Sequence, residues 1–565
     1  MRVPTGKDAW NNFTKSEKLF PASFFLALTV VMAYPYSLHP ASGVLTIGTD
    51  TDLYIWALGW DVHAFLHHPL SIFDANIFYP FKHTLAYSEN VIGSAILAAP
   101  IIWITNNPML AFNVIALLSI PLSAFGAYLL ARRLGLSQAA AILCGLIFGF
   151  SPPRFLRLDQ FHLTTIQWVP FALAYLHGYF RTGAKRELRL AAVFFSLQAL
   201  TSGHGAAMLV LGMLLLTGER LLRGEPLAPV RRLRDLGVPG ALALLPSALI
   251  YLPYRAAQVE IGFRRELDDW SISTSSFFSS ASHLQTWLIS RMPDWAWLQH
   301  EPDAWLFPGI LPILLAAAAF VVRPRRPVDA RVPDYRWLYL TIVLVTIWFA
   351  VGPPYGVWRW VYWLPGLNFV RVPSRFMLLG LLGLGVLAGI GFDRLMAARS
   401  ALVQRRAALV IGLLMLGEFA VLPLNVQPYR VDPPSLDTWL ATQPTPFAVV
   451  EVPVPDSLSV VTQEQRTTLY MLHSLGHYQP IVQGYSGIQP PGYEGLHQKL
   501  ITFPDEVSLR TLIDLGVKYA VEHIDLIPPT ERDEVAARYE KFKDWLTLEH
   551  VDGQGRIYLL HYPRQ

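Results

Sequence analysis

The chain has 565 residues, of which 53% are hydrophobic and only 15% are charged. Soluble domains carry about 25% charged residues, so this composition excludes an ordinary soluble enzyme and indicates an integral membrane protein with many spans. The net charge of +4 decides little, because membrane orientation depends on where Lys and Arg lie. The single cysteine, Cys144, excludes an intrachain disulfide.

The N-terminal part predicts one span followed by a long external loop. Residues 20–38 are apolar and follow a basic segment, which places the N-terminus in the cytoplasm. Within the loop, residues 52–67 predict a helix lying along the membrane surface. Residues 95–104 are too short to span and predict a re-entrant or surface helix.

Ten further spans follow from the apolar segments that remain. They are predicted at 109–131, 137–150, 163–180, 188–200, a segment ending near Arg220, 236–253, 306–322, 337–352, 375–397 and 407–423. With eleven spans, every dense basic cluster falls on the cytoplasmic side. Counting 91–105 as a span would place Arg132 and Arg133 outside and invert everything after them. The external loops are then 39–108, 151–162, 254–305 and 353–374.

The composition changes near residue 425, where charges and prolines rise and long apolar runs end. Strands are predicted at 446–454, 517–521 and 556–561, and helices at 464–474, 508–515 and 529–545. This alternation predicts a small α/β domain, 425–565, on the external side of the membrane. Residues 1–424 form the predicted transmembrane core.

Asp50 and Asp52 follow the first span at the membrane edge. A carboxylate loses solvation there, so a functional role is the default hypothesis. A carboxylate beside a hydroxyl can accept its proton as the hydroxyl attacks, which makes both residues candidate catalytic groups. The same pair offers oxygen ligands for a divalent cation such as Mg²⁺ or Mn²⁺. The alternative is structural, with Thr49 or Asp50 capping the helix that follows.

The candidate substrate-binding residues lie in loops predicted to face the same side of the membrane, or in the external domain. They are Arg154, His162, His204, Arg264, Arg265, Arg371, Arg375 and Tyr485. Arginine suits a phosphate because its planar guanidinium donates paired, charge-assisted hydrogen bonds.

Several of these candidates have a structural alternative. His204, flanked by Gly203 and Gly205, is alternatively an interface histidine. Arg371 and Arg375 would also serve to anchor a span, and Arg264 and Arg265 to form a solvated salt-bridged patch. Tyr485 lies in a turn that either docks the C-terminal domain or covers the active site. The pairs His63/His67 and His473/His477 have the spacing of metal ligands, but no HExxH-type glutamate accompanies them, so they do not predict a metal site.

At this point the sequence resembles the GT-C superfamily of membrane glycosyltransferases, and more closely a group of large bacterial multispan proteins. The resemblance extends over nearly the whole chain. It rests on the acidic pair after the first span and on the stretches 73–80, 85–89, 150–154, 167–170, 371–376, 484–487 and 515–519.

This resemblance implies an α-helical polytopic GT-C-like fold and the transfer of a sugar from a polyprenyl-phosphate donor by inverting displacement. It implies that Asp50 is the catalytic residue. The partners would be the bilayer, a polyprenyl-phosphate-linked sugar and a glycan, lipid or protein acceptor, with no nucleic acid. The expected location is the cytoplasmic membrane of a bacterium. A transporter or flippase, or a non-catalytic envelope assembly protein, is the alternative.

Overall fold

The computed structural model describes residues 15–225, 228–262, 272–292, 294, 297, 305–323, 334–351, 355–364, 367, 370, 372–456 and 461–563. The chain divides into two compact units. Unit 1 comprises Met1–His39, Val114–Leu249 and Arg264–Val426, and unit 2 comprises Pro40–Asn113, Ile250–Phe263 and Gln427–Gln565. The first long loop of the sequence therefore belongs to the same unit as the C-terminal region.

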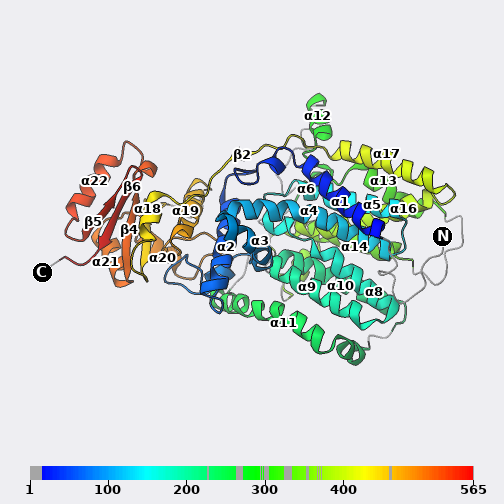
Figure 1. Ribbon diagram of the computed structural model, residues 1–565, viewed down its shortest axis with the longest axis horizontal. Helices are drawn as coiled ribbons and strands as arrows, with labels where there is room; N and C mark the ends of the chain where they lie inside the picture. The colour runs from blue at the N-terminus through cyan, green and yellow to red at the C-terminus, as the bar shows by residue number, and fades with distance from the viewer. Residues whose placement is uncertain are drawn as a thin grey trace. The chain divides into compact units, whose positions relative to one another are not determined.

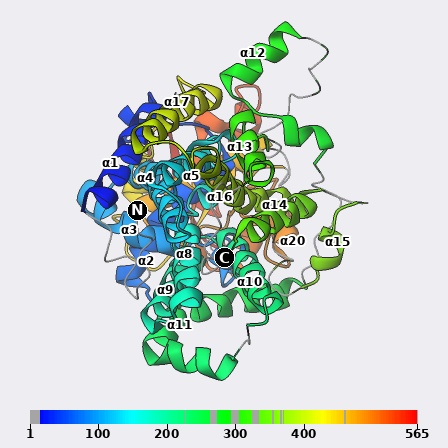
Figure 2. The ribbon, with the colours of Figure 1, turned by 90° about the vertical axis from the view of Figure 1, so that its right-hand side faces the viewer.

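Unit 1 is a bundle of helices (Figures 1 and 2). Its helices are α1 (Lys15–Met32), α4 (Pro108–Arg133), α5 (Gln138–Phe150), α6 (Pro152–Phe155), α7 (Phe161–Thr164), α8 (Trp168–Thr182), α9 (Lys185–Thr201), α10 (Gly203–Leu222), α11 (Pro229–Ile261), α12 (His283–Arg291), α13 (Ile310–Val321), α14 (Arg336–Ala350), α15 (Trp358–Val361), α16 (Met377–Leu395) and α17 (Ala401–Phe419), with a 3₁₀ turn, η6 (Pro373–Phe376). Two of these helices, α4 and α11, include residues that belong to unit 2.

Small residues allow α16 to lie at the centre of this bundle, packed against α5, α13 and α14. A Cβ on Gly391 would lie 1.8 Å from the carbonyl oxygen of Leu315 on α13, so only glycine permits this approach. Gly385 makes a similar approach to Cys144 on α5, where a Cβ would lie 3.2 Å from the backbone oxygen. Small residues at helix interfaces are typical of membrane bundles.

A helix occupies the position of each of the eleven predicted spans. Within the described residues, four helices, namely α4, α10, α11 and the segment Pro373–Leu395, are long and apolar enough to cross a membrane. Shorter apolar helices lie at Gln138–Phe150, Ile310–Val321 and Arg336–Ala350. These helices fit a multi-pass membrane protein, while eleven spans stays a prediction.

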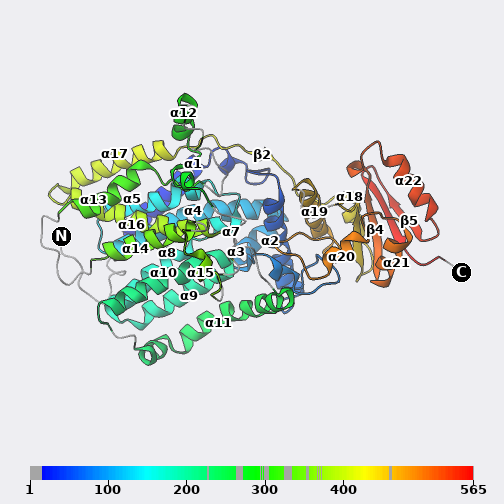
Figure 3. The same ribbon diagram turned by 180° about the vertical axis from the view of Figure 1, so that it is seen from behind.

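Unit 2 contains a four-stranded sheet (Figure 3). Its strand order is β3-β4-β6-β5. The strands are β3 (Ala448–Val452), β4 (Val517–His523), β5 (Leu546–Val551) and β6 (Gly555–Leu560). β3 and β4 are parallel, with Val450 opposite Ala520, and the other two pairs are antiparallel. Three strands lie at the predicted positions, whereas β5 was not predicted.

The helices of the C-terminal segment are short. They are α18 (Ser435–Leu440), α19 (Val461–His473), α20 (Tyr493–Gln498), α21 (Glu506–Asp514) and α22 (Arg532–Lys541), with a 3₁₀ turn, η7 (Ser474–Gly476). A small two-stranded sheet pairs β1 (Gly43–Val44) with β2 (Gln427–Pro428). This pairing ties the start of the first loop to the start of the C-terminal segment.

The first loop contributes α2 (Thr49–His67) and α3 (Ile92–Thr105) to unit 2. The sequence predicted α2 as an amphipathic surface helix, and this is wrong. Residues on all sides of α2 are buried, including Trp56, Trp60 and Asp61, because α3 and α19 both pack against it. A helix that is buried all round has no face free to lie on a bilayer.

Candidate active site

Asp52 is buried beneath side chains of the C-terminal segment. Its carboxylate accepts a hydrogen bond from the Tyr429 hydroxyl at 2.7 Å and one from the Thr468 hydroxyl at 3.2 Å. Only 3% of the residue is exposed. Burial raises the pKa of Asp52 to about 6, while the two hydrogen bonds lower it. Asp52 thus holds the N-terminal end of α2 against α19 and the residue that follows β2.

Asp50 lies on the first turn of the same helix and is exposed. Residues two apart on a helix point in nearly opposite directions, about 200° apart. The structure therefore separates the two carboxylates of the pair, one toward the interior of unit 2 and the other toward solvent. The helix dipole stabilises a negative charge at this end of α2.

This arrangement also tests the pair as a metal site. Both oxygens of Asp52 accept hydrogen bonds from hydroxyl groups, and Asp50 lies on the opposite side of the helix. The two carboxylates do not converge on a common point, so we derive no step through a metal at this pair.

The first loop is anchored by a backbone ladder to the segment that follows η7. The N–H groups of Phe78 and Tyr79 donate to the carbonyl oxygens of Gln483 and Ile481 at 3.0 Å each. Gly484 is required here because a Cβ would lie 2.6 Å from the Phe78 ring. The turn at 484–487 thus packs against the first loop within unit 2.

Tyr485 is half-buried, and its backbone N–H lies 3.2 Å from the sulfur of Met471 on α19. Tyr485 follows Gly484, which packs against the Phe78 ring, and so lies on the segment that anchors the first loop. The structure places it within unit 2, beside α19.

Unit 1 gathers three of the predicted substrate-binding residues. His204 lies at the start of α10, Arg375 in η6 and His162 in α7. Arg375 Nη1 lies 3.2 Å from His204 Nε2, and the rings of His162 and His204 are 5.2 Å apart. A guanidinium only donates, so His204 Nε2 is the acceptor and its proton lies on Nδ1. The result is a donor-rich group formed by three chain segments.

Arg154 lies in the interior of unit 1 and is fully buried. Its guanidinium donates to Ser123 Oγ at 2.7 Å and to the Thr164 carbonyl at 2.9 Å. These bonds join α4, α6 and the end of α7, which is a structural role. Arg264, Arg265 and Arg371 lie outside the described residues.

A second polar group lies in unit 2, where sequence reasoning did not place one. Asp437, Glu451 and His477 are all buried, and one ligand atom from each lies within 4.8 Å of the others. The signal in the sequence was Glu451, a single acid within the apolar strand Ala-Val-Val-Glu-Val. In the sequence, His477 was considered only as a possible ligand together with His473, whereas the structure places it beside Asp437 and Glu451.

Comparison with solved structures shows which folds this chain is similar to. The chain resembles the arabinofuranosyltransferase AftD from Mycobacteria with a TM-score of 0.60 and 14% identity, over 97% of this chain and 40% of that one. ArnT from Cupriavidus metallidurans, solved with undecaprenyl phosphate, aligns with a TM-score of 0.49 and 14% identity over 97% and 98% of the two chains. At 14% identity the likeness shows the fold alone: this chain has a fold like that of AftD, which agrees with the GT-C-like fold that the sequence resemblance implied.

Residues 22–370 match the model of the family described as "Domain of unknown function (DUF6311)". The chain therefore belongs to this family. None of the curated proteins matches the sequence. The chain spans about two fifths of the length of AftD.

Proposed function

We propose that this protein is a membrane glycosyltransferase that moves a sugar from a polyprenyl-phosphate donor to a hydroxyl acceptor. The observation that carries the proposal is the arrangement at the N-terminal end of α2. In a chain with the GT-C fold, an exposed carboxylate, Asp50, is set on a helix whose own position is locked by Asp52.

In the proposed reaction, Asp50 acts as the general base. As the acceptor oxygen attacks the anomeric carbon of the sugar, its proton passes to the Asp50 carboxylate. The bond between the anomeric carbon and the phosphate oxygen breaks, and the electron pair leaves with the lipid phosphate. Attack from the face opposite the leaving group inverts the anomeric configuration.

Arg375 and His204 are the proposed phosphate-binding residues. A guanidinium matches two phosphate oxygens with paired hydrogen bonds, and the contact of Arg375 Nη1 with His204 orients it. In this proposal the positive charge of Arg375 offsets the negative charge of the lipid phosphate. In this proposal Asp52 is a positioning residue, and Tyr485 belongs to the segment that anchors the first loop.

The test measures transfer of radiolabelled sugars from a panel of polyprenyl-phosphate donors by membranes that contain the wild-type protein or Asp50→Asn at matched expression. We expect at least a roughly 100-fold loss of transfer in Asp50→Asn. Asp432→Asn, a change at another exposed carboxylate of unit 2, serves as the control and should retain transfer.

Two other outcomes would overturn the proposal. Transfer that survives Asp50→Asn would remove Asp50 from the reaction. No transfer with any donor, together with movement of a labelled lipid across the bilayer that depends on the protein, would favour a flippase.

A further inference from the structure

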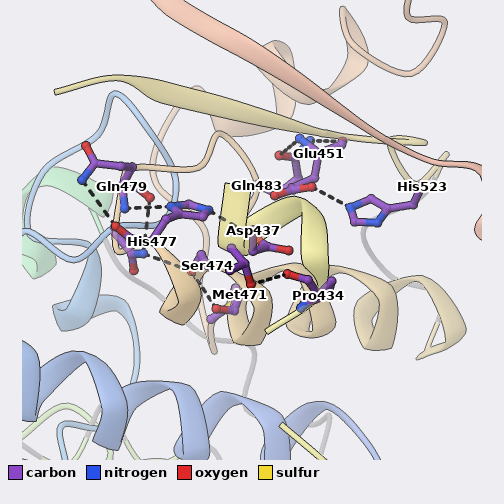
Figure 4. Close-up of polar contacts among 11 residues, drawn as sticks. Pro434, Asp437, Glu451, Met471, Ser474, His477, Gln479, Gln483 and His523 are labelled. Carbon is purple, nitrogen blue, oxygen red and sulfur yellow. Dashed lines mark hydrogen bonds and ion pairs between the residues drawn. The ribbon is translucent and has the colours of Figure 1, made fainter. Parts of the chain in front are cut away.

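Three buried side chains of unit 2 converge on one point beside the sheet (Figure 4). Asp437 comes from α18, Glu451 from β3 and His477 from the residue after η7. One ligand atom from each lies within 4.8 Å of the others. Asp437 and Glu451 are 0% exposed, and His477 is 7% exposed. Segments more than ten residues apart in sequence thus bring two acids and an imidazole together in the interior.

Most of the ligand atoms in this cluster lack a hydrogen-bond partner among the described residues. These atoms are both oxygens of Asp437, Oε1 of Glu451 and Nε2 of His477. His477 Nε2 lies 3.5 Å from Asp437 Oδ1. A buried carboxylate without a donor is destabilising by several kcal/mol, so the arrangement calls for a further group at this point.

The charges of the cluster do not balance. His523 Nε2 lies 2.7 Å from Glu451 Oε2. This contact occupies one oxygen of Glu451 and leaves Oε1 without a hydrogen-bond donor among the described residues. His477 Nδ1 accepts the Gln479 N–H at 2.9 Å, which leaves a neutral ring with its proton on Nε2. The negative charge of Asp437 is therefore uncompensated.

Neighbouring groups do not supply the missing positive charge. Burial lowers the pKa of His473 to about 4, so this histidine is neutral at pH 7. No arginine or lysine forms an ion pair with Asp437 or Glu451 in the part of the chain that the structure describes.

We propose that Asp437, Glu451 and His477 bind a divalent transition-metal ion of the zinc type. Imidazole nitrogen and carboxylate oxygen are ligands that zinc prefers. Two ligands about 2.05 Å from a tetrahedral zinc lie about 3.3 Å apart, close to the separation of His477 Nε2 and Asp437 Oδ1. The ion would offset the negative charge of Asp437 and give this buried carboxylate a partner that the described side chains do not supply.

Metal binding has a definite consequence for His477. The ring must present Nε2 without a proton, so its proton moves to Nδ1, and the contact with the Gln479 N–H is lost. Metal-bound histidines usually donate their second ring N–H to a nearby acceptor. Binding thus changes the tautomer of His477, and this change can be observed.

The site would stabilise the segment that positions α2. Ser474, three residues before His477, accepts a hydrogen bond from Asn76 Nδ2 at 3.0 Å. Asn76 Oδ1 in turn accepts the indole N–H of Trp56 at 3.2 Å. Trp56 lies on α2, less than two turns after Asp50. The proposed ion is structural and distinct from the acidic pair at the start of α2.

The test measures zinc in the purified full-length protein in detergent, after loading with zinc chloride and desalting. We expect about one zinc per chain in the wild type and in Asp50→Asn, which controls for binding at the acidic pair. Asp437→Asn and His477→Gln should each bind zinc at least tenfold more weakly. X-ray absorption of the zinc should show only nitrogen and oxygen ligands, with imidazole among them.

Thermal unfolding provides a second measurement that does not depend on the zinc content. A chelator should lower the Tm of the wild type and leave that of Asp437→Asn unchanged. Without an ion, Asp437→Asn would instead raise the Tm, because it removes a buried uncompensated charge. Zinc below one tenth per chain in the loaded wild type, zinc retained by both variants, or a Tm insensitive to chelator would each overturn the proposal.

Discussion

Replacing Asp52 with asparagine should stabilise unit 2 at neutral pH. The amide oxygen of the introduced side chain can accept the Tyr429 hydroxyl as the Asp52 carboxylate does now. Thr468 Oγ1 already lies 3.0 Å from the Gln465 carbonyl, so its proton can turn to that oxygen while the hydroxyl accepts from the new amide NH₂ group. The substitution therefore keeps both contacts and removes only the charge.

The magnitude follows from the pKa of Asp52. Burial raises this pKa from 3.8 to about 6. A carboxyl group whose pKa is higher in the folded state binds its proton more tightly there, so wild-type stability falls as pH rises from about 4 through 6 and is level above. A shift of roughly two units corresponds to about 3 kcal/mol, or about 6–12 °C in Tm for a unit of this size.

The assay is thermal unfolding of the purified protein in detergent between pH 4 and pH 8. We expect Asp52→Asn to match the wild type near pH 4 and to exceed it progressively up to pH 7. Asp432→Asn, at an exposed carboxylate, should follow the wild type throughout. The reasoning is refuted if Asp52→Asn is less stable than the wild type at pH 8, or if their difference is independent of pH.

Two other substitutions test the anchoring of the first loop and the phosphate-binding group. Gly484→Ala places a methyl group against the Phe78 ring. It should lower the free energy of unfolding by about 1–3 kcal/mol, which is measured as a lower Tm. The control is Gly495→Ala, where a Cβ meets nothing within 4 Å, and it should leave the Tm unchanged. Arg375→Lys should raise the KM for the lipid-phosphate donor at least tenfold, because a lysine cannot make the paired contact. An unchanged KM would argue against phosphate binding by the group that Arg375 forms with His204.

Periodicity and charge predicted most of the helices, because a membrane span needs a long apolar run and basic residues mark its cytoplasmic end. The position of α16 and the strands β3, β4 and β6 followed directly from such local patterns. β5 was missed although Leu546 to Glu549 alternate between apolar and polar, because the strand is short and mostly exposed. Its place in the sheet is set by the hairpin with β6.

The environment of the acidic pair could not be predicted. Asp52 is held by Tyr429 and Thr468, which lie 377 and 416 residues further along the chain. A local reading treats two nearby carboxylates as equivalent, and only the tertiary packing of α19 on α2 makes one buried and the other exposed. Likewise, nothing local relates Asp437 to Glu451 and His477.

The most direct test of the proposed function compares sugar transfer by Asp50→Asn and Asp52→Asn in the same membranes. With a polyprenyl-phosphate donor that the wild type uses, Asp50→Asn should lose transfer at least about 100-fold, while Asp52→Asn should retain most of it. Loss in Asp52→Asn with activity retained in Asp50→Asn would contradict the assignment of Asp50 as the base.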